Sequence, residues 1–208
     1  MAAWRRAYRV SNIYIGGAAR GCAQPRLNAG WVARVRRMGY RLIPTYVGLQ
    51  APCSRYGPRF THRNAVAQGR IAAVDAVHRA RALGITELNP IYFDLEMYNS
   101  RKSQCRRSVL RFVHHWTLGV RRLGYVPGIY SSASSGIRDI GRSEGFARPK
   151  VIWFAHWDGR TDPYRCAYLA SHWWPPHRRI KQYRGGHRET HGGVTLNVDS
   201  NMVDGRVY

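Results

Sequence analysis

Acidic residues are scarce in this sequence. The 208 residues include 34 Lys+Arg but only 11 Asp+Glu, which gives a formal net charge of +23 at pH 7. Such a charge favours anionic partners: nucleic acid, an anionic membrane surface or an acidic cell-wall polymer. An equally open interpretation is that arginine is simply the general solvated residue of a GC-rich genome. The arginines are scattered over all segments, whereas a nucleic-acid module usually clusters them on one face.

Long apolar runs are also missing. No stretch of about 18 uncharged apolar residues occurs, so we predict no transmembrane segment. The first residues, Met1 to Arg6, lack the apolar core and cleavage site of a signal peptide. Hydrophobic residues still make up 44% of the chain, which is enough for a folded core. The length fits one domain, residues 1–208.

Metal-ligand spacing is absent as well. The chain has four cysteines, Cys22, Cys53, Cys105 and Cys166. They form no CxxC pair and no Cys/His pattern, which argues against a structural zinc site. Disulfides and free thiols both remain open, and the spacing does not give a pairing. His156 is the one histidine placed near a candidate site, and we expect it to be structural. We predict no metal and no cofactor.

The units strand, loop, helix and glycine recur along the chain. Helical spacing covers residues 27–38, 66–83 and 109–123, and a glycine follows each helix. The second helix is expected to bury Ile71, Val74, Val77 and Ala80. Seven strands are predicted, beginning near residues 10, 41, 91, 126, 151, 179 and 194, and Pro44 predicts a bulge or local strain in the second. The alternation indicates a parallel sheet with right-handed crossovers. Because a closed βα barrel has eight strands, we predict an α/β fold, a TIM-type (β/α) barrel that lacks its first strand.

The most informative stretch is Asn89 to Tyr98, in which a short apolar strand ends in two acids. Side chains alternate between the faces of a strand, so Asp94 and Glu96 point the same way. No lysine or arginine lies between them. A strand that only packs has no use for two neighbouring carboxylates, whereas a site that needs one proton donor and one anion does.

Other polar and aromatic residues are predicted at the same ends of the strands, where a βα barrel carries its site. Asp158 and Asp199 close two further strands, and Gln182 and Tyr183 close the strand between them. Aromatic faces stack on sugar rings. We predict the catalytic residues Glu96, Asp94 and Asp199. We predict the substrate-binding residues Gln182, Tyr183, Tyr14, Tyr46, Tyr130, Trp157 and Asp158. A helix N-cap is the alternative role for Asp158.

The segments YIGG, LIPTYVGLQAP, IYFDLE, GIYSS, WFAHWDG, QY and GGVTLNVDSN together resemble a bacterial family of glycoside hydrolase-like domains, the Rv2525c-like family (DUF1906). That family is similar to the family 25 lysozymes, which are βα barrels that cleave peptidoglycan glycan. The resemblance covers nearly the whole chain and implies an extracellular or cell-surface barrel. It matches Glu96 to the general acid of the lysozyme D-x-E motif, Asp94 to its partner carboxylate and Asp199 to the acid of the last strand. The Phe-Asp pair of the family's first strand has no counterpart before Trp4, which implies a truncated domain or a start further upstream.

Three functions follow as hypotheses. The leading one is a monomeric, lysozyme-like glycoside hydrolase that acts on cell-wall glycan. The second is a barrel that binds cell-wall carbohydrate without cutting it. The third, suggested by charge alone, is nucleic-acid binding; no helix-turn-helix or zinc-finger pattern occurs, so we expect no specific nucleic acid as a partner.

Overall fold

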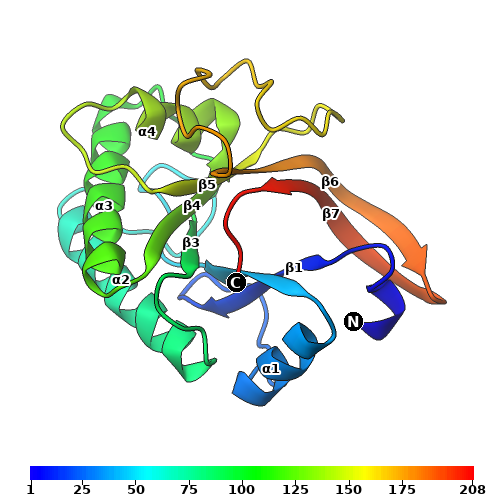
Figure 1. The fold of residues 1–208 in the computed structure, drawn as a ribbon. Coiled ribbons are helices and arrows are strands. Elements are labelled where there is room, and N and C mark those ends of the chain that lie inside the picture. The colour runs from blue at the N-terminus through cyan, green and yellow to red at the C-terminus, as the bar shows by residue number, and fades with distance from the viewer.

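The computed structural model describes residues 1–208, in which one curled sheet is flanked by helices on its outer face (Figure 1). The sheet holds β1 (Val10–Gly16), β2 (Arg41–Tyr46), β3 (Pro90–Asp94), β4 (Val126–Ser132), β5 (Val151–Ala155), β6 (Arg179–His191) and β7 (Val194–Asp204), in that order. Neighbours from β1 to β6 are parallel. The edge strands β1 and β7 do not pair with each other. The prediction of a TIM-type (β/α) barrel with seven strands is confirmed, as an open barrel.

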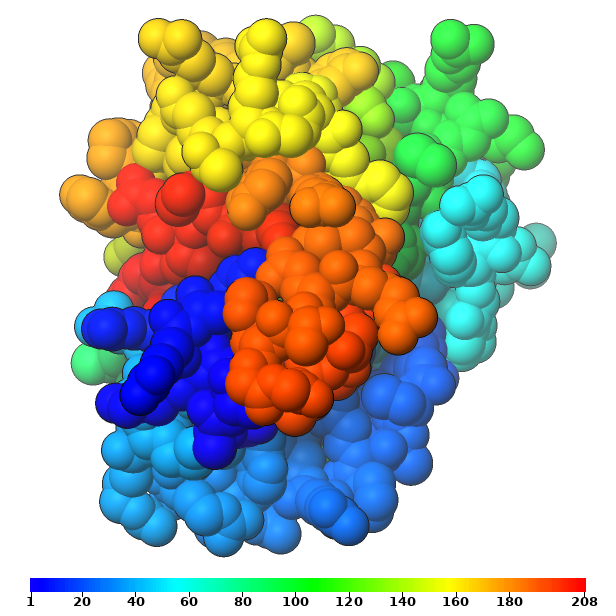
Figure 2. All heavy atoms as spheres, turned by 90° about the vertical axis from the view of Figure 1, so that its right-hand side faces the viewer, coloured from blue at the N-terminus to red at the C-terminus, as the bar shows by residue number.

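The last two strands correct the prediction of an all-parallel sheet. β6 and β7 form an antiparallel hairpin whose turn is Gly192-Gly193, both with positive φ. Parallel strands need a crossover of a dozen or more residues, and the segment between the predicted sixth and seventh strands was too short for one. The hairpin tip lies against the N-terminal segment (Figure 2), where Trp4 Nε1 donates to Val194 O at 3.1 Å and Tyr8 OH donates to Glu189 Oε2 at 2.7 Å.

The helices follow the predicted spacing. They are α1 (Ala29–Arg37), α2 (Ala65–Ala82), α3 (Ser103–Arg122) and the short α4 (Arg138–Arg142), which continues a π turn over Ala133–Ile137. A 3-10 turn covers Ala2–Trp4. Asn28 caps α1 by accepting from the backbone N–H of Trp31. Gly39, Gly84 and Gly124 follow the three long helices with positive φ, the backbone that a glycine C-cap provides.

Strand side chains divide between two apolar clusters. The larger cluster fills the layer between the sheet and the helices and includes Ile91 and Phe93 of β3. The smaller cluster fills the barrel interior with Ile43, Tyr92, Val126, Val151, Trp153 and Ile180. Because side chains alternate along a strand, Asp94 follows Tyr92 on the inner face.

Helix α2 buries only half of the predicted stripe: Val77 and Ala80 are buried as predicted, whereas Ile71 and Val74 are not. Ile71 and Val74 are 57% and 60% exposed, whereas the buried residues are Ala65, Gly69, Ala72, Ala73, Ala76, Val77 and Ala80. A Cβ added to Gly69 would lie 2.4 Å from Phe112 O of α3. The small residues therefore allow α2 and α3 to pack closely, and this close approach decides which face is buried.

Pro44 does not interrupt β2, so the predicted bulge is wrong. The β1–β2 register runs through the pair Ile13–Pro44 and shifts only between Tyr14 and Gly16. Pairing of β2 with β3 begins at Thr45, just after the proline. Pro44 therefore precedes the residues of β2 that pair with β3, and the N–H that proline lacks is not needed for a hydrogen bond between these two strands.

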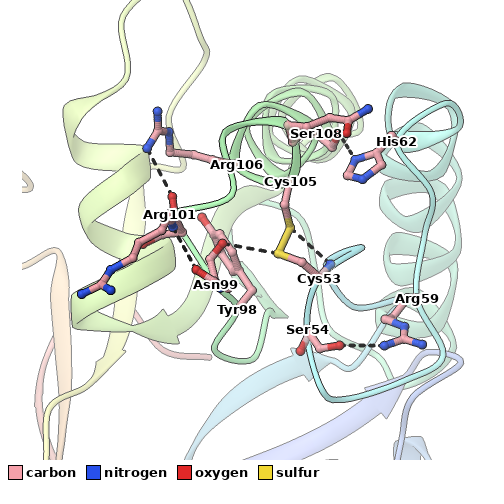
Figure 3. Close-up of a disulfide and its surroundings, with 12 residues drawn as sticks. Cys53, Ser54, Arg59, His62, Tyr98, Asn99, Arg101, Cys105, Arg106 and Ser108 are labelled. Atoms are coloured by element: carbon pink, nitrogen blue, oxygen red, sulfur yellow. Dashed lines mark hydrogen bonds between the residues drawn. A yellow bond between two sulfur atoms is a disulfide. The ribbon is translucent and has the colours of Figure 1, made fainter.

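One disulfide, Cys53–Cys105, joins the loop after β2 to the first turn of α3 (Figure 3). In the same loop Ser54 Oγ donates to Met97 O at 3.1 Å, which ties the loop to the segment that follows β3. Cys22 and Cys166 are free thiols, exposed and buried respectively. Cysteine spacing left the pairing open. The structure contains one disulfide and two free cysteines.

Replacing both bridged cysteines, as Cys53→Ala with Cys105→Ala, should lower the free energy of unfolding by roughly 2–4 kcal/mol, because the bridge restricts the unfolded chain over a long loop. The bridged residues are 52 positions apart. Urea denaturation measures the change. Cys22→Ser is the control and should leave the midpoint unchanged; equal stability of the double variant and the wild type would contradict the prediction.

Candidate active site

A cavity of about 620 Å³ opens along the inner faces of β1 and β7 and over the ends of β3 and β4. Its polar lining includes Ser11, Asn12, Tyr14, Asp94, Glu96, Tyr130, Gln182, Asn197, Asp199 and Asn201. Arg9 is the only arginine or lysine among its lining residues. In so basic a chain, this cavity gathers carboxyls and amides and almost no positive charge.

Asp94 and Glu96 form one wall of the cavity. Asp94 is 7% exposed, and its Oδ1 has no hydrogen-bond partner. Burial, with a smaller contribution from the charge of Glu96, raises the pKa of Asp94 to about 8. Burial also raises the pKa of Glu96, against the opposing effects of the Met97 N–H and Arg55. At neutral pH the pair therefore retains at least one proton.

Gln50 fixes the backbone that carries both acids. Its side chain is buried, its Oε1 accepts from Glu96 N at 2.8 Å, and its Nε2 donates to Asp94 O at 2.9 Å. Nε2 also donates to Gly48 O at 3.0 Å. One amide thus holds the chain on both sides of Leu95, and the two carboxyls keep their positions after β3 has ended.

The opposite wall is built around Gln182 of β6. Its Oε1 accepts from Tyr130 OH at 3.0 Å and from Trp157 Nε1 at 2.9 Å. These two donors orient the amide so that Nε2 donates to Asp199 Oδ2 at 3.2 Å. Burial raises the pKa of Asp199, and His187 opposes that rise.

Two tyrosines lie between the walls. Burial raises the pKa of Tyr14 to about 12, and Asp94, Asp199 and Glu96 add to the rise in that order. Burial and the same three carboxyls also raise the pKa of Tyr130. Both phenols are therefore neutral hydrogen-bond donors, and the three carboxyls act on one shared space.

Six of the ten residues predicted for the site line this cavity: Asp94, Glu96, Asp199, Gln182, Tyr14 and Tyr130. Asp199 and Gln182 lie within β7 and β6 rather than at strand ends, because the hairpin extends beyond the barrel.

The other four predicted residues lie outside the cavity lining. Tyr46 faces the helix layer, where its OH donates to Asp75 Oδ2 at 2.7 Å. Asp158 pairs with the buried Lys181 at 2.8 Å. Trp157 is 65% exposed and meets the site only through its bond to Gln182. Tyr183 lies at the register shift of β6 between Gln182 and Arg184 and is not among the residues that line the cavity.

Sequence reasoning missed Gln50, Asn12 and Asn201. Asn12 precedes Tyr14 by two residues on β1, so alternation could have placed it on the inner face; its Oδ1 accepts from Thr45 Oγ1 at 2.5 Å. Asn201 accepts from Trp153 Nε1 at 2.7 Å. Gln50 gave no signal, because its partners are 44 and 46 residues away in the chain.

No group of three or more His, Cys, Asp or Glu side chains is arranged to hold a metal ion. His156 Nδ1 lies 3.3 Å from Asp158 Oδ2 and 3.5 Å from Cys166 Sγ, outside the lining of the cavity.

This barrel, with paired carboxyls at its mouth and a third carboxyl across the cavity, has the architecture of a glycoside hydrolase-like domain. The chain belongs to the Rv2525c-like, glycoside hydrolase-like domain family, whose model matches residues 2–203. No curated protein sequence matches the chain.

Several solved structures share the fold. The Tat-secreted protein Rv2525c of Mycobacterium tuberculosis, in complex with L-tartrate, is 14% identical, with 97% of this chain and 88% of that chain covered and a TM-score of 0.64. The catalytic domain of endolysin ply40, from bacteriophage P40 of Listeria monocytogenes, is 15% identical, with 97% and 85% covered and a TM-score of 0.55. The modular autolysin LytC of Streptococcus pneumoniae is 15% identical, with 94% of this chain but 41% of the autolysin covered and a TM-score of 0.58. None of the helices in this chain has both the length and the apolar character needed to span a membrane.

The raised pKa of Asp94 predicts a pH-dependent stability. Between pH 3.8 and about 8 the unfolded chain is ionised at this residue while the folded protein keeps the proton, so stability falls as pH rises through this window. Asp94→Asn removes the ionisation and should raise the free energy of unfolding at pH 7 by up to about 4 kcal/mol, with little change near pH 4.

Urea denaturation across this pH range measures the effect of Asp94→Asn. The matched control is Glu144→Gln, which removes an exposed carboxyl outside the cavity. Parallel pH profiles for Asp94→Asn and the wild type would show that the buried carboxyl does not titrate as described.

Replacing Gln50 by leucine should loosen the backbone at Glu96. The change leaves the Glu96 N–H and two buried carbonyls without partners, which should lower the free energy of unfolding by roughly 1–3 kcal/mol or more. Hydrogen exchange at the Glu96 amide should accelerate more than exchange elsewhere in the sheet. Gln104→Leu, at an exposed position of α3, is the control. Unchanged exchange at the Glu96 amide of the Gln50→Leu variant would show that Gln50 does not hold this backbone.

Proposed function

We propose that the protein is a lysozyme-like glycoside hydrolase that acts on bacterial cell-wall glycan. The observation that carries the proposal is the pair of the buried Asp94 and the half-buried Glu96, neither with a salt-bridge partner, which share one cavity with Asp199. Glycoside hydrolysis uses a protonated carboxyl together with an ionised one. The endolysin and autolysin domains that share the fold support the choice of substrate class.

Glu96 acts as the general acid. It lines the cavity and is less buried than Asp94, so it is the member of the pair that a bound glycan can reach. Its raised pKa favours the protonated form that donates to the leaving glycosidic oxygen. Asp94, with its pKa near 8, holds a proton beside it, so Glu96 can become anionic without facing a second buried charge.

Asp199 supplies the ionised carboxylate. It lies on the opposite wall, held through Oδ2 by Gln182, and its pKa is raised only in part because His187 opposes the effect of burial. From there it stabilises the positive charge that develops on the sugar, or orients a substrate acetamido group that attacks internally. Tyr14 and Asn201 donate hydrogen bonds to sugar hydroxyls, Tyr130 OH accepts one while it donates to Gln182, and Trp153 provides an apolar wall.

The disulfide supports a location outside the reducing cytosol. Cys53–Cys105 joins the loop that carries Gln50 to α3, and such bonds persist in oxidising compartments. A cell-surface or extracellular location agrees with a cell-wall substrate.

The replacement Glu96→Gln should lower the rate of reducing-sugar release from purified peptidoglycan by about 10²–10⁴-fold, because the amide cannot protonate the leaving oxygen. Asp199→Asn should also lower the rate, and Glu144→Gln should leave it unchanged. Equal rates for wild type and Glu96→Gln would remove Glu96 from the mechanism.

A binding-only barrel is distinguished in the same experiment. Sedimentation with insoluble peptidoglycan should retain wild type and Glu96→Gln alike, because the substitution preserves the shape of the cavity. Retention of the wild type with no product on long incubation would replace hydrolysis by binding as the function.

A further inference from the structure

A second cavity lies at the opposite end of the barrel and has the opposite charge. It has a volume of about 790 Å³ and lies where the parallel strands begin. Its cationic lining residues are Arg121, Arg148, Lys150, Arg178 and Arg206, and no Asp or Glu is among the residues that line it. We propose that this cavity is a binding site for the phosphate groups of an anionic cell-wall polymer built of polyol phosphates.

Topology explains why these cations meet. Lys150 directly precedes β5 and Arg178 directly precedes β6, while Arg206 follows the end of the antiparallel β7. Arg121 lies in the last turn of α3. Parallel strands begin at one edge of the sheet, so residues far apart in the sequence converge on one end of the barrel, away from Asp94 and Glu96.

The positive charges in this cavity are not neutralised by the protein. None of the five side chains forms a salt bridge with a carboxylate. Arg148 and Arg206 donate only to the backbone carbonyls of Ser143 and Leu88. The nearest acid, Glu87 beside Gly124, is paired with Arg81 at 3.0 Å. Unpaired cations around a concave surface focus a positive potential and attract anions.

A buried hydroxyl lies in the wall of this cavity. Thr117 is 2% exposed and lines the same cavity, and its Oγ1 has no hydrogen-bond partner. Oγ1 itself is covered by neighbouring atoms, so an anion in this cavity is held by the cationic side chains and not by this hydroxyl. A phosphate offers several acceptors and pairs well with guanidinium groups.

The shape and the aromatic residues favour a polyol phosphate over a nucleic acid. Tyr125 and Trp174 are buried, with their polar tips bonded to Ile85 O and Pro149 O. Trp173 is packed against Gly141. Only Trp173 is partly exposed among the Trp and Tyr rings of the cavity, so the cavity lacks the series of exposed rings on which successive bases of a single strand stack. A concave surface also cannot enter a duplex groove. The choice of a cell-wall polymer rests on the proposed function.

The test is titration calorimetry with a glycerol-phosphate oligomer at several salt concentrations. Lys150→Glu with Arg178→Glu should weaken binding at least tenfold and reduce the slope of log affinity against log salt by about 2. The control, Arg37→Glu with Arg111→Glu, has the same net charge at exposed positions outside the cavity and should change affinity by less than about twofold. No binding by the wild type, or equal weakening in both double variants, would overturn the proposal.

Two further measurements distinguish the polyol-phosphate site from a nucleic-acid site and from the proposed hydrolase site. A single-stranded oligonucleotide with the same number of phosphates should bind more weakly than the oligomer; equal or tighter binding at this cavity would overturn the assignment to polyol phosphate. Hydrolysis of peptidoglycan stripped of phosphate polymers should be the same for wild type and the Lys150/Arg178 variant. Polymer binding without any hydrolysis would refute the proposed function and leave this site in place.

Discussion

The candidate site depends on the burial of one carboxyl group that has no positive partner. Asp94 sits in a chain with 34 Lys+Arg, yet none of these side chains reaches it. Its neighbours Phe93 and Leu95 are fully buried in the helix-facing core, so the carboxyl cannot turn to solvent without unpacking both. The core thus holds the acid in a medium that disfavours its ionised form. A buried acid of this kind lowers the stability of the fold, and such residues are typical of functional sites.

The same topology separates the charges of the molecule. In a parallel barrel the ends of the strands form one mouth and their beginnings form the other. The acid-bearing residues that follow β3 lie at the first mouth, and Lys150 and Arg178, which precede β5 and β6, lie at the second. The net charge of +23 therefore does not reveal that the charge is distributed unevenly between the two ends of the barrel. The first cavity leaves Asp94 without a positive partner, which favours its protonated form, while the second cavity carries unpaired cations.

Local rules account for what could be predicted from the sequence. Alternation along a strand placed Asp94 and Glu96 on one face, and helical spacing with terminal glycines located the three long helices. The errors came from contacts between distant segments. Helix α2 buries its alanine face because α3 approaches closely, which hydrophobicity within α2 alone does not reveal. Gln50 reaches across 44 residues to Asp94, and no local pattern marks such a contact.

The β6–β7 hairpin shows how a contact between distant segments places a side chain in the candidate site. Asp199 reaches the cavity because β7 pairs antiparallel with β6 in the register Gln182–Asn201. A slip of one residue would turn Asp199 to the other face and remove the third carboxyl from the site. The register has supports at both ends of the hairpin: the Gly192-Gly193 turn and the Trp4 and Tyr8 bonds hold the tip, and the Trp153–Asn201 bond holds the barrel rim. The N-terminal segment, far from the acids in sequence, therefore helps to fix the distance between the two walls of the site.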